Sequence, residues 1–161
     1  MLEIGGIVIC DRYKFTAMAR DGARGVSNDI IEQNYSFAPE PDLTIFFDIP
    51  PEIGYQRIIS GRPSLKWYEA GLDMGWTHDP FESYKILQGK IKSIYDGLVS
   101  EGRIERIDAN GSVAEIQARV RKLIGDKLDF ANIDTIDETD RMAENIRSSS
   151  FDWMQFHEDG E

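Results

Sequence analysis

Short apolar runs rich in β-branched residues alternate along the chain with longer amphipathic stretches. The runs cover residues 7–10 and 43–49, and the first is followed by an acid, Asp11. Residues 103–107 are a weaker third strand candidate, again followed by an acid, Asp108. Unbroken apolar runs of this length are typical of parallel strands that are covered on both faces of a sheet. Because strands and helices alternate, we expect an α/β fold with right-handed crossovers.

The intervening segments carry helix signals. Ser27 is placed to cap one helix, and Pro50 with Pro51 suits a first helical turn, which does not use the amide hydrogen that proline lacks. After Asp79 and after Ser112, apolar residues recur at three- and four-residue steps, the spacing of one buried helix face. The predicted helices cover residues 28–34, 51–59, 80–98 and 113–124.

Residues 60–79 show no clear periodicity. They hold Gly61, Pro63, Gly71 and Gly75 among charged and aromatic side chains. A stretch of this length without regular structure is uncommon inside a compact domain, and such loops are often active-site lids. We therefore predict a lid over residues 60–79.

The net charge of −11 is concentrated at one end of the chain. Residues 129–161 carry ten acidic side chains against Arg141 and Arg147, which leaves the rest of the chain close to neutral. We expect one domain over residues 1–128 and a solvated acidic tail over residues 129–161. Because residues 151–156 include four large apolar side chains, a short docking segment in the tail is a second interpretation.

Composition also limits the partners. No basic stretch is suited to nucleic acid, and no apolar run approaches the roughly 18 residues of a membrane span. Cys10 is the single cysteine, so no internal disulfide can form and a reducing cytoplasm is the simplest setting. Its place in an apolar run predicts a buried side chain.

Charged residues follow the first predicted strand. In open α/β sheets, ligands bind outside the carboxyl ends of the strands, so Asp11 and Arg12 are expected at a ligand crevice. Arg12 offers a planar fork of donors for a phosphate or a carboxylate, although an Asp11–Arg12 ion pair that ties down a loop is an equal alternative. Arg20 and Arg24 would share one helix face, either as part of an anion site with Arg12 or as a solvated surface.

Four segments, in order, resemble elements of the thymidylate kinase family. Residues 11–17 resemble its DRY-x-x-S/T-x-A element, and residues 41–52 are similar to its PDL-strand-D-x-PPE segment. Residues 61–71 resemble the lid of a prokaryotic branch, and residues 107–109 resemble the last strand and the turn that borders the adenine site. The resemblance runs from about residue 4 to 128, and four elements at matching spacing are far more specific than one.

The resemblance implies transfer of a phosphoryl group from ATP to dTMP with Mg²⁺, as part of nucleotide biosynthesis. It also implies roles for particular residues of this chain. Catalytic roles fall to Asp11, Arg12, Arg57, Arg62 and Lys66. Substrate-binding roles fall to Tyr13, Phe15, Thr16, Arg20, Arg24, Tyr68 and Glu69. The adenine border would be formed by Asp108 and Ala109, with no direct metal ligand and with Asp11 contacting the ion through water.

The sequence departs from the family in two places. Arg20-Asp21 stands where many members have Tyr-Gln, which leaves the base of the acceptor nucleotide open. The GxxxxGK(S/T) loop that holds ATP phosphates in P-loop kinases occurs nowhere in the sequence, so the implied nucleoside monophosphate kinase fold is expected to be incomplete, with a parallel sheet that lacks the P-loop strand.

The missing strand would lie between residues 7–10 and residues 43–49. These two runs could pair directly, a partner chain or a homodimer could fill the slot, or the chain could belong to a longer product. We expect marginal stability and weak ATP binding. Two alternatives to thymidylate phosphorylation remain: a non-catalytic kinase remnant that binds another protein, and a kinase for another deoxynucleoside monophosphate.

Overall fold

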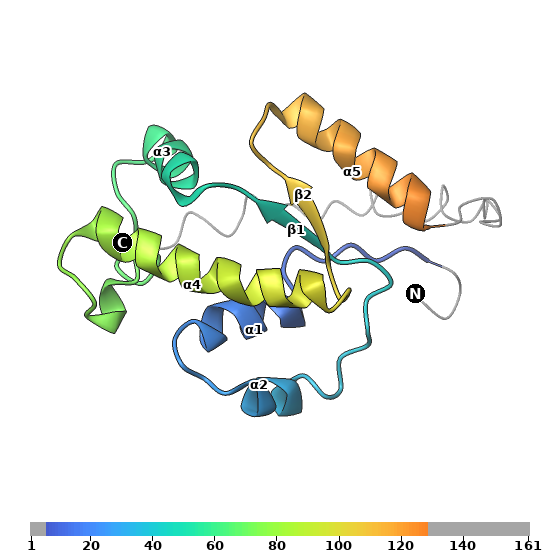
Figure 1. Cartoon of the computed structure of the whole chain (residues 1–161), viewed down its shortest axis with the longest axis horizontal. Helices are drawn as coiled ribbons and strands as arrows, with labels where there is room; N and C mark the ends of the chain where they lie inside the picture. Colours follow the sequence, from blue (N-terminus) through green and yellow to red (C-terminus); the bar gives the residue numbers. More distant parts are fainter. Residues whose placement is uncertain (1–5, 129–161) are drawn as a thin grey trace, which may run out of the picture. The chain divides into compact units, whose positions relative to one another are not determined.

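The computed structural model describes residues 6–128 of the chain, so the acidic tail lies outside the described residues. Helices and strands alternate, which confirms the α/β class (Figure 1). The elements are α1 (Lys14–Gly22), α2 (Asn28–Asn34), β1 (Ile45–Asp48), α3 (Pro51–Gly61), the 3₁₀ turn η2 (Leu72–Met74), α4 (Pro80–Ser100), β2 (Glu105–Asp108) and α5 (Val113–Lys127). None of the helices described has the length and apolar character needed to cross a lipid bilayer.

The sheet of the described region consists of β1 and β2, which pair in parallel with Ile45 opposite Glu105 and Asp48 opposite Asp108. The pairing continues past β2, where the amide of Ala109 donates to the carbonyl of Asp48 at 2.8 Å. Two of the predicted strands, at residues 43–49 and 103–107, are therefore confirmed. Their parallel direction requires a long crossover, which α3, the lid segment (residues 60–79) and α4 supply.

The strand predicted at residues 7–10 is wrong. These residues form no strand and are exposed, with Ile9 91% exposed, and Cys10 is exposed rather than buried. An apolar β-branched run forms a strand only where a neighbouring strand satisfies its amide and carbonyl groups. In the described region nothing pairs with residues 7–10, so the direct pairing with residues 43–49 does not form.

The four predicted helices are confirmed, and their starts follow local chemistry. Asp79 accepts a hydrogen bond from the amide of Glu82 at 2.8 Å at the start of α4. Ser112 and Glu115 form a reciprocal capping box at the start of α5, which satisfies amide groups that have no partner inside the helix. Ser27 stands before α2 as predicted, but its side chain makes no capping hydrogen bond.

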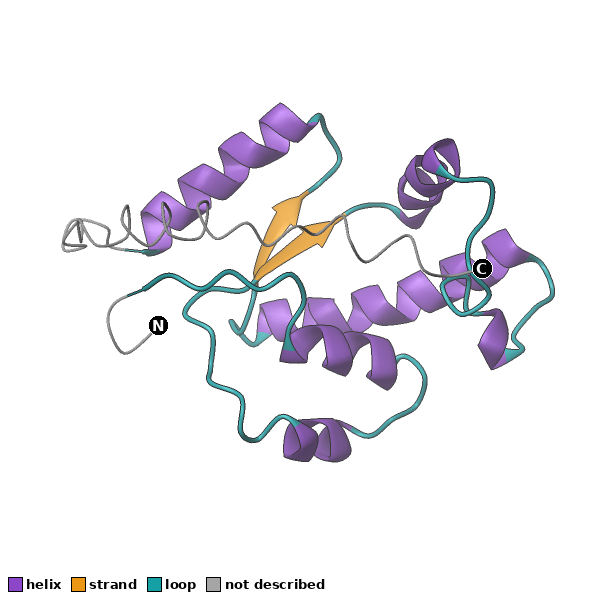
Figure 2. Ribbon diagram, turned by 180° about the vertical axis from the view of Figure 1, so that it is seen from behind, coloured by secondary structure: helices purple, strands orange, loops and turns teal. Residues whose placement is uncertain are grey.

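A fifth helix, α1, packs against α4 and supplies much of the core (Figures 1 and 2). Its approach is close, because a Cβ added at Gly22 would lie 3.1 Å from Cδ1 of Ile94. Phe46 of β1 stacks on Tyr95 of α4 with ring centroids 4.4 Å apart, and so joins the sheet to the same core. The buried cluster comprises Phe15, Met18, Ile31, Leu98 and Ile104.

A cluster of charges joins β1, β2 and α4 at the carboxyl end of the sheet. Asp48 accepts hydrogen bonds from Nζ of Lys92 at 2.5 Å and from Nη1 of Arg106 at 3.2 Å. Asp96 also accepts hydrogen bonds from Lys92 and Arg106, at 3.4 and 2.5 Å. We call these four residues the paired cluster, because every charge in it faces an opposite one.

Candidate functional site

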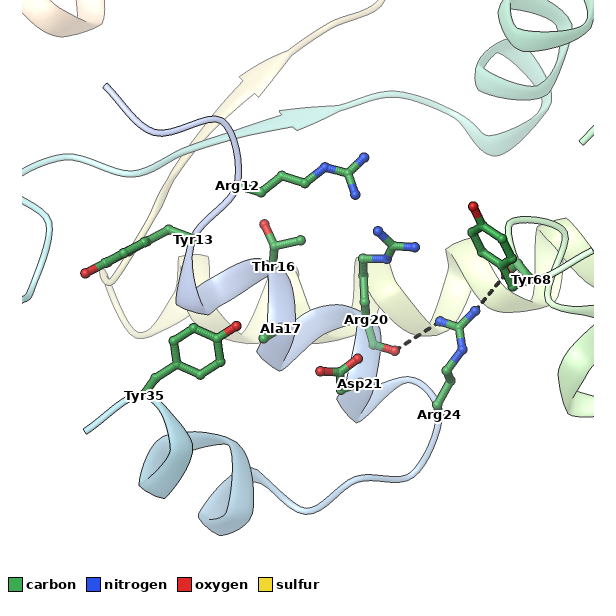
Figure 3. Close-up of a pocket in the computed structure, with 9 residues that line it drawn as sticks. All are labelled: Arg12, Tyr13, Thr16, Ala17, Arg20, Asp21, Arg24, Tyr35 and Tyr68. Atoms are coloured by element: carbon green, nitrogen blue, oxygen red, sulfur yellow. Dashed lines mark hydrogen bonds between the residues drawn. The ribbon is translucent and has the colours of Figure 1, made fainter. Parts of the chain in front are cut away.

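A cavity of about 540 Å³ opens along the exposed face of α1. Thr16, Ala17, Arg20 and Asp21 share this face because their spacing matches the helical repeat. The remaining walls come from the loop before α1, the turn after it, the end of α2 and the lid segment (Figure 3). This cavity, here called the arginine pocket, is lined by Arg12, Tyr13, Thr16, Ala17, Arg20, Asp21, Arg24, Tyr35 and Tyr68.

Arg12 and Arg20 bring two positive charges to the arginine pocket. Neither guanidinium makes a hydrogen bond or an ion pair with another of residues 6–128. In Figure 3 both side chains extend toward the side of the pocket where Tyr68 lies. The carboxylate of Asp21 lines the same pocket but forms no ion pair with either arginine. An anionic ligand would therefore give the two guanidinium groups the partner that they lack among residues 6–128. The arrangement is therefore suited to a phosphate or a carboxylate.

The backbone of Arg12 is strained. Its φ is 73°, and no other non-glycine residue of the described region has a positive φ. For a residue with a Cβ, this left-handed conformation costs about 1–2 kcal/mol. Such strain is concentrated at functional positions, where the surrounding structure holds a side chain in a particular direction. Here that side chain is the first arginine of the pocket.

Arg24 lines the same pocket, but its guanidinium is fully engaged. Nε donates to Oδ2 of Asp73 at 3.0 Å, Nη2 donates to the carbonyl of Tyr68 at 2.7 Å, and Nη1 donates to the carbonyl of Arg20 at 3.3 Å. Arg24 thus differs from Arg12 and Arg20, although the sequence grouped all three as candidates for one anion site.

Two aromatic residues that follow Arg12 have separate positions. Tyr13 lines the pocket and its hydroxyl donates to the carbonyl of Pro39 at 3.1 Å. Phe15, predicted to bind substrate, is 3% exposed and belongs to the core. Arg103 lies over its ring, with Cζ 5.0 Å from the centroid. Tyr13 is the N-cap residue just before α1, whereas Phe15 lies in the first turn of the helix and faces the core.

Three charged residues of the lid segment, Arg62, Lys66 and Glu69, contact one another. Arg62 forms an ion pair with Glu69, and the backbone amide of Lys66 donates to Oε2 of Glu69 at 3.0 Å. These hydrogen bonds, the one from Arg62 above all, hold the pKa of Glu69 below its ordinary value. Nζ of Lys66 lies 5.9 Å from the ring centroid of Tyr68. Of these residues, only Tyr68 reaches the arginine pocket.

A second group of predicted residues meets at the turn between β2 and α5. Arg57 of α3 donates to the carbonyls of Ala109 at 3.2 Å and of Gly111 at 3.1 Å. Oδ1 of Asp108 accepts from the amide of Asn110 at 2.8 Å. None of these residues lines the arginine pocket, so the structure divides the sequence-predicted site into two places.

Asp11 is exposed and lies outside the pocket lining. Among residues 6–128 no group of three or more His, Cys, Asp or Glu side chains is placed to bind a metal ion. As a hard oxygen donor next to Arg12, Asp11 still has the chemistry that suits Mg²⁺, which is commonly held by one or two carboxylates, by waters and by substrate phosphates.

Three lining residues were missing from the sequence prediction. Ala17 and Asp21 could have been found, because they each follow a predicted residue, Thr16 and Arg20, and fall on the same helix face. Tyr35 had no such signal, because it enters the pocket from the end of a different helix, α2.

The chain was also compared with known proteins. The family model described as "Thymidylate kinase" matches residues 1–120. "Probable thymidylate kinase 2" of Saccharolobus solfataricus is 37% identical over 130 residues, which cover 80% of this chain and 61% of the relative. "Thymidylate kinase" of Desulfotalea psychrophila is 35% identical over 116 residues, 72% of this chain and 50% of the relative. The chain therefore spans between half and about three fifths of the length of these relatives.

Proposed function

The chain belongs to the thymidylate kinase family, and we propose that it forms the acceptor side of phosphoryl transfer from ATP to dTMP, which gives dTDP. The observation that carries this proposal is a cavity of about 540 Å³ that holds the guanidinium groups of Arg12 and Arg20, neither of which has a partner among residues 6–128. A nucleoside monophosphate supplies the dianion that two such groups require. Tyr35, Tyr68 and the hydroxyl of Thr16 supply apolar and polar surface for its nucleoside.

In this proposal Arg12 binds the acceptor phosphate through a bidentate contact, and Arg20 contributes the second positive charge. Phosphoryl transfer depends on positioning and on neutralising the charge that develops on the transferred group. The strained backbone of Arg12 fixes the direction of its side chain before substrate arrives, so less order has to be created on binding.

The lid segment would complete the site. Tyr68 already lines the pocket, and its ring lies near the ammonium of Lys66. We propose that Arg62 and Lys66 bring positive charge to the transferring group when the lid closes on both nucleotides, and that Glu69 holds Arg62 in the meantime. Lid closure of this kind also excludes water from the reacting groups.

The donor side is proposed at the turn after β2. Arg57 fixes the carbonyls of Ala109 and Gly111, which makes this turn a defined surface for the adenine ring beside Asp108. The Mg²⁺ ion that accompanies ATP neutralises charge on the phosphates. Asp11, the exposed carboxylate that precedes Arg12, is the group that we assign to the water shell of this ion.

Asp21 favours a second candidate, a kinase for another deoxynucleoside monophosphate. Its carboxylate lines the arginine pocket beside Arg20, and a carboxylate accepts hydrogen bonds but donates none. A base or sugar with more donors than thymidine presents would suit that acceptor. Affinities for dTMP, dUMP, dCMP and dGMP distinguish the two candidates, because the preferred acceptor binds most tightly.

A fluorescence titration of the 161-residue chain tests the proposal. Trp67 is 63% exposed and adjoins Tyr68, so its emission reports on the pocket. We expect a saturable change with dTMP and at least about tenfold weaker binding of thymidine, which lacks the phosphate that Arg12 binds. The variant Trp67→Phe should lose the signal and keep dTMP affinity measured by calorimetry.

Formation of dTDP from ATP and dTMP is measured on the same preparation. Equal affinity for thymidine and dTMP would overturn the phosphate-binding role of Arg12 and Arg20. Absence of binding by every nucleotide tested would instead support the non-catalytic interaction protein, the alternative that the sequence leaves open.

A further inference from the structure

Arg24 is held on a rigid turn. Arg24 follows Ala23, the C-cap of α1, and precedes Gly25, whose φ is 93°. The amide of Gly25 donates to the carbonyl of Gly22 at 2.9 Å, and the amide of Val26 donates to the carbonyl of Asp21 at 3.1 Å. Because these hydrogen bonds hold the backbone of Arg24 in place, its guanidinium can bridge distant segments with little loss of conformational entropy.

The guanidinium of Arg24 joins α1 to two places in the lid segment. Its partners are the carbonyl of Tyr68, 44 positions later, and the carboxylate of Asp73, 49 positions later. The ion pair is mostly shielded from water, with side-chain exposures of 20% for Arg24 and 22% for Asp73. Shielding makes such a pair stronger than a surface pair, because water screens it less.

Asp73 depends on Arg24. Its second oxygen, Oδ1, is buried and has no hydrogen-bond partner in the described part of the chain, so the contact through Oδ2 is what compensates the carboxylate for leaving water. Any movement that separates this carboxylate from the guanidinium of Arg24 is costly, because it would leave a partly buried charge without a partner.

Packing against α4 also anchors the lid segment. Ala70 is 1% exposed, and a Cβ at Gly71 would lie 3.1 Å from Cβ of Leu87 on α4. This packing fixes the segment at Ala70–Gly71, to one side of Tyr68. The hydrogen bond from Arg24 to the Tyr68 carbonyl is the contact that joins Tyr68 itself to the end of α1.

We propose that Arg24 is a positioning residue rather than a ligand of the substrate. Together with Asp73 it forms a latch that holds Tyr68 at the arginine pocket and ties the lid segment to the backbone of Arg20, whose side chain lines the same pocket. The identity of the pocket's ligand rests on the proposed function, whereas the latch itself can be tested without any ligand.

Hydrogen exchange of the ligand-free 161-residue chain tests the latch. The latch variants are Arg24→Gln, Asp73→Asn and the double variant that combines these two changes. The control is Arg121→Gln, which removes a positive charge from an exposed position on α5. The amides of Glu69, Gly71 and Leu72 are hydrogen-bonded within the lid segment. Each latch variant should raise their exchange rates about tenfold or more, and the double variant should add little to either single one. Unchanged exchange in Arg24→Gln would overturn the proposal.

Binding gives the second readout. If Arg24 acts through Tyr68, Arg24→Gln should weaken dTMP about tenfold and Asp73→Asn, which lies outside the pocket lining, should weaken it equally. Arg24→Lys should restore part of both effects, because an ammonium can hold Asp73 but lacks the second fork of donors. A loss confined to the Arg24 variants would identify Arg24 as a direct ligand instead.

The two hypotheses fail in different ways. If the native chain does not bind dTMP, the proposed function fails, while the exchange data still decide the latch. If Arg24→Gln does not fold, Asp73→Asn and Arg24→Lys carry the same test with smaller changes.

Discussion

The arginine pocket and the paired cluster are two charged regions of opposite design. In the paired cluster, Lys92 and Arg106 each contact both Asp48 and Asp96, so its charges are balanced within the protein. In the arginine pocket, Arg12 and Arg20 make no such contact with residues 6–128. The balanced charges of the paired cluster join secondary-structure elements, whereas the two guanidinium groups of the arginine pocket are suited to bind an anionic ligand.

The largest expected effect is on ligand affinity. Arg12→Gln should weaken dTMP about 100-fold, because a bidentate charge-assisted contact to the phosphate is lost. Isothermal titration calorimetry measures the change. The matched variant Arg106→Gln removes the same group from the paired cluster and should change affinity less than about twofold. If both variants lose affinity equally, the distinction between the two regions is wrong.

The next effect is on stability. Asp48→Asn should lower the free energy of unfolding by about 1–2 kcal/mol, because Lys92 and Arg106 both lose a charged acceptor whose side chain is 19% exposed. Urea denaturation followed by circular dichroism measures this change. Arg12→Gln serves as the control and should stay within about 0.5 kcal/mol of the native chain. No loss in Asp48→Asn would mean that the paired cluster does not stabilise the fold.

A smaller effect tests the strain at Arg12. Arg12→Gly should leave the unfolding free energy unchanged or raise it by up to about 1 kcal/mol, because glycine tolerates a φ of 73° but also loses more entropy on folding. The same variant should lose dTMP affinity as Arg12→Gln does. Thermal and urea denaturation provide the comparison. A clear destabilisation would show that the Arg12 side chain supports the fold rather than the site.

The smallest effect concerns pH and the lid segment. Because the hydrogen bond from Arg62 lowers the pKa of Glu69 from its ordinary 4.5, the pairing is complete above that value and is lost as the pH falls through the lowered pKa. Trp67 emission should therefore change with a midpoint below pH 4.5, and Arg62→Gln should move this midpoint upward toward the ordinary value. The control variant Arg121→Gln should have the same midpoint as the native chain. A midpoint that Arg62→Gln leaves in place would mean that another group titrates.

The helices that sequence patterns predicted share one property: their signals are local. Proline at Pro51, the cap at Asp79 and the capping box at Ser112 act within one helical turn, so they operate whatever surrounds them. The run at residues 7–10 is equally apolar, yet it is exposed and forms no strand with any other part of the described region. A strand needs a neighbour, and a sequence pattern cannot report whether one is present.

The candidate site shows the same limit. Motif spacing identified Arg12, Tyr13, Thr16, Arg20, Arg24 and Tyr68, all of which line the arginine pocket. Their separate tasks were not predictable, because Arg24 and Arg20 are the same residue type at a helical spacing. What distinguishes them is a contact with Asp73, which is distant in sequence and approaches through the folding of the lid segment.

The sequence by itself determined the class of the fold, the positions of α2, α3, α4, α5, β1 and β2, and the family to which the chain belongs. These features depend on hydrophobic periodicity, on turn chemistry and on motif order, which are properties of neighbouring residues. Only the tertiary structure decided that Phe15 is buried, that Arg57 meets the turn after β2, and which arginines have no partner among residues 6–128. Whether a charge is paired depends on which groups the folded chain brings within a few ångströms of it. The spacing of residues along the sequence does not predict that proximity.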